Sequence, residues 1–262
     1  MALTKQQSEE IKKYLVDKIN KKLENYNSET NSMPFHYRLL GKDRMALFSF
    51  IHSINTMLGT SIFEHVGELI AKPQAEIAIK QYKGLEGYVS SKAVLTIDSI
   101  MRELRAAAGR KPNKLKETTE ILAAITQGEM GEKIKKRVDL FVKMKDGVEY
   151  YFELKIAKPN INEFTSIKKQ LLDWVAMRGS QKPDVKIKTI VAIPYNPYEP
   201  QLYERWTLQG LFDLNEEVLV GKEFWDMLGG KNTYEDLLKV FEQAGLELYN
   251  EIDLKMKSFH SK

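Results

Sequence analysis

Asp139, Glu153 and Lys155 are the residues whose types and spacing point most directly to chemistry in this chain of 262 residues. They lie in the segment 137–157, RVDLFVKMKDGVEYYFELKIA, whose apolar runs indicate covered strands. Two neighbouring carboxylates resist ionising together, whereas a hard divalent cation with oxygen ligands allows both to stay charged. The alternative is a pair of solvated acids on an exposed sheet face, salt-bridged to Arg137, Lys143 or Lys155, but unpaired charge is costly in a covered strand. The segment therefore predicts a metal site.

A hairpin is the element that must position these side chains. Apolar residues alternate with other residues on both sides of a Lys-Asp-Gly loop at 145–147: Val138, Leu140, Val142 and Met144 before it, and Val148, Tyr150, Phe152 and Leu154 after it. With Gly147 in the left-handed conformation of a three-residue loop, the numbers of paired residues sum to 292, so that Asp139 opposes Glu153. A two-residue Asp-Gly turn would instead pair an apolar residue with Glu153 and mix the two faces. The first register is therefore predicted; it places the side-chain origins of the two acids about 5 Å apart, with Lys155 on the same face.

This arrangement resembles the motif of the PD-(D/E)xK nuclease superfamily, although Val138 stands where the name of the motif has proline. Three longer segments are similar to the TdeIII-type type II restriction endonucleases: PFHYRLLGKDRMALFSFIHSINTMLGTSIFE at 34–64, FELK at 152–155 and GKEFWDMLGG at 221–230. The resemblance implies a magnesium-dependent homodimer that cuts double-stranded DNA within a short interrupted palindrome of the GGNCC kind. It also implies an α/β fold, with a PD-(D/E)xK core of a mixed central sheet flanked by helices and with helical N- and C-terminal elaborations.

The resemblance assigns roles within the hairpin. Asp139, Glu153 and the main-chain carbonyl of Leu154 would hold Mg²⁺, which binds a phosphate oxygen and lowers the pKa of an attacking water. Lys155 would orient that water and offset the developing charge. Superfamily members often add an acidic residue from an earlier helix, and Glu64 is the candidate here, with Glu68 and Glu76 as substitutes for it. The Ser-x-x-Glu spacing that ends at Glu64 is also that of a capping box, which would make this residue a structural cap.

Candidate DNA contacts fall in three segments, and for each the alternative is a side chain that is merely solvated. One segment is the entry to a predicted helix, the second is a Gly-Arg-Lys-Pro loop, and the third is a helix after the hairpin. The candidates are, in that order, Arg38, Lys42 and Arg44; Arg110 and Lys111; and Lys168 and Gln170.

Length and composition, with 43% hydrophobic and 29% charged residues, fit one globular domain with elaborations. We divide it into an amphipathic helix and linker at 1–33, a nuclease core at 34–202 and a helical extension at 203–262, whose aromatic residues complete a core or form a dimer interface. The other expected elements are helices at 5–25, 117–126 and 162–178, a helix that breaks at Gly59 and restarts at Ser61, a buried central strand at 188–194, and C-terminal helices from Tyr203 that break at Gly229-Gly230 and resume with a cap at Thr233.

Composition also bounds the function. The absence of cysteine excludes disulfides, cysteine-ligated zinc and a thiol nucleophile. The charged N-terminus lacks an apolar signal core and no apolar run approaches membrane-spanning length, so a cytoplasmic protein without a membrane partner is expected. The net charge of +4 permits a polyanionic partner without requiring one. No Walker GxxxxGK[ST] run is present, so no nucleotide cofactor is expected.

Two other functions fit part of the pattern. A DNA-repair or junction-resolving nuclease on the same core would prefer branched or damaged DNA over intact duplex. A non-catalytic DNA-binding protein with a relict nuclease fold is a different class, and retention of Asp139, Glu153 and Lys155 in one register argues against it.

Overall fold

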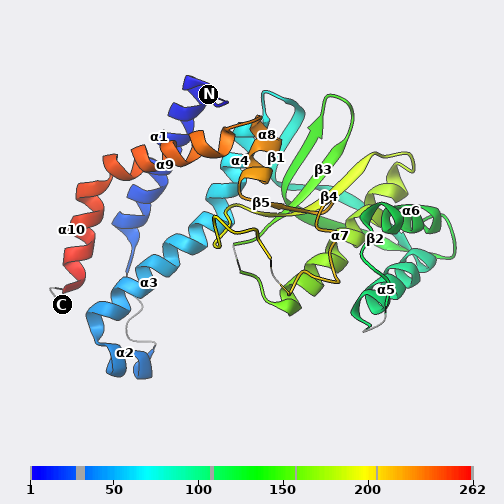
Figure 1. Cartoon of the computed structure of the whole chain (residues 1–262), viewed down its shortest axis with the longest axis horizontal. Coiled ribbons are helices and arrows are strands. Elements are labelled where there is room, and N and C mark those ends of the chain that lie inside the picture. The colour runs from blue at the N-terminus through cyan, green and yellow to red at the C-terminus, as the bar shows by residue number, and fades with distance from the viewer. Residues whose placement is uncertain (1, 28–32, 107–108, 157, 205, 261–262) are drawn as a thin grey trace.

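A five-stranded sheet with helices on both faces forms the body of the molecule (Figure 1), as the computed structural model shows for residues 2–27, 33–106, 109–156, 158–204 and 206–260. The strands lie in the order β1-β2-β3-β4-β5, with bounds Ala75–Ser90, Met130–Met144, Glu149–Leu154, Ile187–Ile193 and Val218–Val220. Strands β1, β2 and β3 pair antiparallel, whereas β3, β4 and β5 pair parallel. The expected mixed sheet flanked by helices is therefore confirmed.

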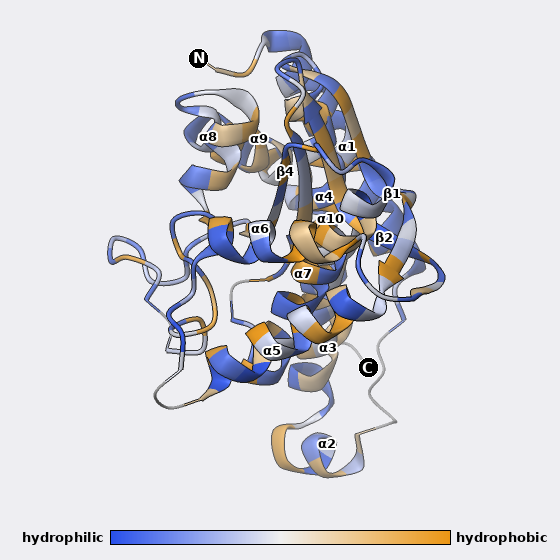
Figure 2. Cartoon of the chain, turned by 90° about the vertical axis from the view of Figure 1, so that its right-hand side faces the viewer, coloured by the Kyte–Doolittle hydropathy of each residue, from blue (hydrophilic) through white to orange (hydrophobic). Residues whose placement is uncertain are grey.

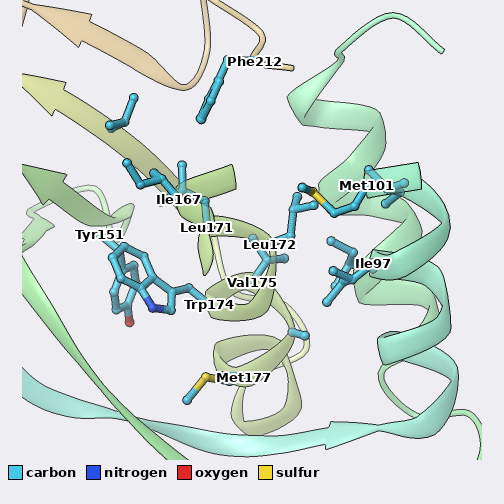
Figure 3. Packing of buried hydrophobic residues seen from close by; sticks show 14 of the residues in the cluster. Ile97, Met101, Tyr151, Ile167, Leu171, Leu172, Trp174, Val175, Met177 and Phe212 are labelled. Atoms are coloured by element: carbon cyan, nitrogen blue, oxygen red, sulfur yellow. The ribbon is translucent and has the colours of Figure 1, made fainter. Parts of the chain in front are cut away.

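Two hydrophobic clusters cover the two faces of this sheet. The helices are α1 Lys5–Asn25, α2 Pro34–Leu40, α3 Lys42–Met57, the π-helical turn η2 Leu58–Ile62, α4 Phe63–Ala71, α5 Ser91–Arg105, α6 Lys114–Ala124, α7 Ile161–Gln181, α8 Lys222–Gly229, α9 Thr233–Glu247 and α10 Tyr249–His260. Helices α5, α6 and α7 build the cluster on one face, and α1, α4, α8 and α9 build the cluster on the other. Figure 3 shows the first cluster, in which Trp174 of α7 packs beside Tyr151 of β3, with 6.5 Å between the ring centroids.

The β2–β3 hairpin has the predicted register. Leu140 pairs with Phe152 and Val142 with Tyr150, so the paired numbers sum to 292. Gly147 has φ of +83°, a left-handed conformation that favours glycine, and the three-residue loop closes as predicted. The loop is further held by the backbone N–H of Val148, which donates to Asp146 Oδ1 at 3.0 Å.

Strand β2 departs from regular alternation next to Asp139. Val138 packs in the cluster with α7, whereas Leu140 packs in the cluster with α4, although residues two apart on a regular strand share a face. On β1, the residue opposite Asp139 is Gln81, whose φ of +50° is uncommon for a residue other than glycine. Strand β2 is therefore irregular at Asp139. The predicted alternation would place Val138 on the same face of the sheet as Leu140, and the structure does not.

The expected break at Gly59 is a π-helical turn within one continuous helix. A Cβ atom at Gly59 would lie 2.7 Å from Cδ1 of Ile156, so glycine permits a close approach to the end of β3. The helix Lys42–Ala71, 30 residues long, is able to cross a membrane by length and composition alone, with 22% of its apolar window buried. Core helices of soluble proteins pass the same test, and this helix carries no conclusion about a membrane.

Two regions differ most from expectation: the arm formed by helices α2 and α3, and the region from residue 206 to the start of α9. Helix α2 and the start of α3 lie away from the sheet (Figures 1 and 2), and α2 carries the exposed side chains of Phe35 and Leu39. Residues 206–212 form turns where helix was expected, and the short strand β5 follows them. Thr233 begins α9 but does not cap it, since its hydroxyl donates to the carbonyl of Gly230.

Candidate active site

The hairpin brings Asp139, Glu153 and Lys155 to one place near the end of β3. The backbone N–H of Leu154 donates to Asp139 Oδ2 at 2.9 Å, which ties the first acid to the strand that carries the second. The ammonium nitrogen of Lys155 lies 2.7 Å from Glu153 Oε1. Two acids and a lysine therefore form one polar cluster across the hairpin.

Glu64 reaches this cluster from helix α4. Its buried carboxylate accepts a hydrogen bond from Arg137 Nη2 at 3.0 Å, and the same nitrogen lies 3.6 Å from Asp139 Oδ1. The capping-box alternative is wrong, because the helix continues through this region and the hydroxyl of Ser61 donates to the carbonyl of Met57. Glu64 thus faces the sheet as a member of the cluster instead of closing a helix end.

Gln170 reaches the cluster from helix α7, on the opposite face of the sheet. Its side-chain amide donates to Glu153 Oε2 at 2.7 Å. Glu153 is therefore held on one oxygen by Lys155 and on the other by Gln170. Such bonds fix the direction of the carboxylate before any ligand arrives.

Crowded negative charge dominates the electrostatics of the site. Burial and the nearby carboxylate of Glu153 raise the pKa of Asp139 to about 7. Burial also raises the pKa of Glu64, against the opposing effects of the Gln81 side chain and of Arg137. Burial acts to lower the pKa of Lys155, but the carboxylates of Glu153 and Asp139 outweigh it and raise that pKa. The three acids therefore favour additional positive charge.

The donor set fits a hard divalent cation. Among the described residues, no three histidine or acidic side chains converge closely enough to enclose an ion on their own. Mg²⁺ needs no such cage, since it is commonly held by one or two carboxylates and keeps several waters. Asp139 and Glu153 supply those carboxylates, and buried Glu64 Oε2 has no hydrogen-bond partner. The guanidinium between Glu64 and Asp139 marks a position where positive charge is already favoured.

The residues expected to contact DNA are spread over the molecule and, apart from Gln170, do not join the cluster. Arg38, Lys42 and Arg44 are exposed on the arm formed by α2 and α3. Arg110 is largely buried, and its guanidinium is paired with Glu120 at 2.9 Å and with Glu103 at 3.4 Å, whereas Lys111 is exposed. These residues and Gln170 stay candidates for DNA contact.

Lys168 is not available for DNA, which corrects its assignment as a contact. Its side chain is fully buried and pairs with Glu117 at 2.7 Å and with Glu217. A second buried lysine, Lys114, lies 3.1 Å from Glu217. Helix α7 turns this side toward α6 and the segment before β5, so the ammonium group neutralises acids from two distant parts of the chain. The periodicity of α7 alone gives no sign of these partners.

Replacing Lys168 by alanine is therefore expected to lower the free energy of unfolding by about 3–5 kcal/mol, because two buried acids lose their shared cation. The neighbouring Lys169→Ala, which removes an exposed pair with Asp173, is expected to change it by no more than about 0.5 kcal/mol. Chemical denaturation measures both. Equal stability of the two variants would contradict a structural role for Lys168.

Arg137 is the residue of the cluster that sequence reasoning treated only as a solvated salt-bridge partner. The sequence feature that could have indicated its role is its position two residues before Asp139 on the same strand, which places an arginine beside the acid. Its contact with Glu64 spans 73 positions along the chain, and no pattern within the hairpin indicates it.

Comparisons with known proteins identify the family. The family model described as "Type II restriction endonuclease, HinfI" matches residues 3–245. Type II restriction enzyme HgiCII of Herpetosiphon aurantiacus is 28% identical over 232 residues, which cover 88% of this chain and 84% of that enzyme. Type II restriction enzyme HgiEI of the same organism is 28% identical over 225 residues, covering 85% and 81%. Type II restriction enzyme MjaII of Methanocaldococcus jannaschii is 26% identical over 226 residues, covering 82% and 56%.

These matches support the resemblance to TdeIII-type enzymes at the level of type II restriction endonucleases, while the family model that matches is that of HinfI. The match spans the hairpin and both helices that contribute to the acidic cluster. The chain belongs to the HinfI family of type II restriction endonucleases, which are site-specific deoxyribonucleases.

Proposed function

We propose that this protein hydrolyses double-stranded DNA at a short palindromic site, with Asp139, Glu153 and Lys155 as its catalytic centre. The observation that carries the proposal is the position of the two acids beside one another: Asp139 accepts a hydrogen bond from the N–H of Leu154, the residue after Glu153, and Lys155 Nζ lies 2.7 Å from Glu153. Membership of the HinfI family supplies the reaction class, and the raised pKa of Asp139 favours a cation beside it. A site of the GGNCC kind and action in the cytoplasm complete the proposal.

Each polar residue of the cluster has a role in this proposal. Asp139, Glu153 and the main-chain carbonyl of Leu154 would hold Mg²⁺, with Glu64 as a further acid. When bound, the ion supplies a Lewis acid for the phosphate and lowers the pKa of the attacking water. Lys155 positions that water and offsets negative charge that develops on the phosphate. Gln170 keeps the Glu153 carboxylate in a fixed direction.

The exposed basic residues Arg38, Lys42, Arg44 and Lys111 are proposed to contact DNA phosphates, since their side chains are open to solvent. Arg110 would have to leave its two acidic partners to do so.

A homodimer is part of the proposal, because a palindromic duplex has a two-fold axis and each subunit supplies one centre for one strand. Sedimentation of the free protein and of its DNA complex measures this, and a monomer in both states would refute it.

Incubation of intact plasmid with the protein and Mg²⁺, followed by gel electrophoresis, tests the function. Discrete fragments are expected, and their ends define the cleavage site. Intact plasmid together with cleaved four-way junctions would indicate a junction-resolving nuclease instead. Absence of cleavage on every substrate would reduce the function to DNA binding.

Lys155→Ala is expected to lower the cleavage rate by about 100-fold or more without removing metal binding. The reason is that the lysine acts on water and phosphate and is not a ligand. Single-turnover cleavage and calorimetric titration with Mg²⁺ separate the two effects. Loss of metal affinity as the main defect would contradict this role.

A further inference from the structure

Arg137 occupies the position between two acids of the proposed centre. Its Nη2 atom lies 3.0 Å from Glu64 Oε1 and 3.6 Å from Asp139 Oδ1, and it joins strand β2 to helix α4. The Arg137 side chain is 48% exposed, whereas that of Glu64 is 2% exposed. The guanidinium therefore has one edge against the acids and another in solvent, and it can leave without unpacking the core.

A divalent cation on Asp139 and this guanidinium exclude one another. Like charges a few ångströms apart repel, and the repulsion is stronger in a partly buried site than in water. Asp139 also has one oxygen engaged by the backbone of Leu154, so the oxygen facing Arg137 is the one left for an added cation. A cation that uses this oxygen must displace Arg137.

We propose that Arg137 is the internal counterion of the metal-free enzyme, that a divalent metal displaces it, and that the released guanidinium then binds a phosphate of the DNA. This inference rests on the proposed function of the acidic cluster. Arginine suits the second role because its planar fork matches phosphate oxygens and its charge does not depend on pH. Lys133 and Lys135 precede it at alternate positions of β2 and share one acidic partner, Glu86, so the freed group would join a segment with net positive charge.

The proposal links metal binding to DNA binding through one residue. A metal that releases Arg137 raises the affinity for DNA, and by linkage DNA that holds Arg137 raises the affinity for metal. Removing the guanidinium should therefore have two opposite effects. Metal binding without DNA becomes tighter, and the gain in DNA affinity caused by metal becomes smaller.

The first effect is measured by calorimetric titration of the full chain with Mg²⁺ alone at about pH 8.5, where the carboxylates are ionised. Arg137→Gln, which keeps a donor for Glu64 but no charge, is expected to bind Mg²⁺ about 5-fold more tightly or better. The matched control is Lys135→Met, which removes one charge two positions away on the same strand, where Lys135 pairs with Glu86. It is expected to change the affinity less than about 2-fold.

The second effect is measured by duplex binding with and without Mg²⁺ in a Lys155→Ala background, which slows cleavage. Metal is expected to raise DNA affinity in this background, and Arg137→Gln is expected to remove most of that gain. Should Arg137→Gln fail to fold, Arg137→Met carries the test, since it keeps an apolar stem and removes the charge between the two acids. It is then expected to tighten Mg²⁺ binding more than Lys135→Met does.

Mg²⁺ affinity that is unchanged or weaker in the Arg137 variant, with the parent binding metal normally, would overturn this inference and leave the proposed function standing. A parent protein that neither binds Mg²⁺ nor cleaves plasmid would overturn the proposed function itself, and the counterion role with it.

Discussion

Replacing Asp139 or Glu153 by alanine is expected to reduce cleavage of duplex DNA by about 1,000-fold or more while folding and duplex binding stay largely intact. Both side chains are polar groups at the end of the hairpin, and neither belongs to the hydrophobic clusters. Each variant therefore loses a metal ligand without losing apolar packing. Asp139→Ala also removes the carboxylate that repels Glu153. Cleavage kinetics, thermal melting and filter binding to duplex DNA measure the three properties.

Glu76→Ala is the matched control for this experiment. Glu76 is an acid on β1 that pairs with Lys143 at 2.8 Å, and it takes no part in the acidic cluster. Its variant is expected to cleave like the parent. Full activity in Asp139→Ala or Glu153→Ala would remove the proposed mechanism, because no step in it proceeds without these carboxylates.

Deletion of Asp146 is expected to abolish cleavage, which is a far larger effect than a loop deletion usually has. The loop has three residues, and Gly147 alone takes the left-handed conformation that closes it. A loop shortened to two residues either strains Gly147 or slips one strand by a residue, and a slip turns Glu153 and Lys155 to the face opposite Asp139. Cleavage assays combined with circular dichroism separate a slipped register from a general loss of fold.

Asp146→Asn keeps the loop length and an oxygen that can accept from the N–H of Val148, so it is expected to be nearly silent. If the deletion variant folds and cleaves like the parent, the acids are not paired across this turn and the assignment of the centre is wrong.

The β2–β3 hairpin could be predicted from the sequence because two independent local signals agree. The apolar alternation and the Gly147 turn both require the same register, and the structure has it. Helix α7 and strand β4 were predictable for the same reason, since their periodicity and flanking residues carry the information locally.

Strand β1 was not predicted because its sequence, AEIAIKQYKGLEGYVS, contains lysines and two glycines that are typical of loops. It is an edge strand, and pairing with β2 along its length stabilises it. Lys168 and Arg137 were misjudged for a related reason. The acids that pair with them come from segments far away in the chain, and the charge pattern of a single helix or strand does not reveal such partners.

The π-helical turn Leu58–Ile62 sets the rotational phase of the long helix on either side of it. An α-helix rotates about 100° per residue, and a π-turn accommodates one residue more than the α-helical path requires. Glu64 therefore points in the direction that an uninterrupted helix would give to position 63. With this offset, Phe50 packs against Phe259 of the C-terminal helix while Glu64 turns toward Arg137. Because of this one additional residue, the two halves of a single continuous helix present side chains to two parts of the molecule that lie in different directions.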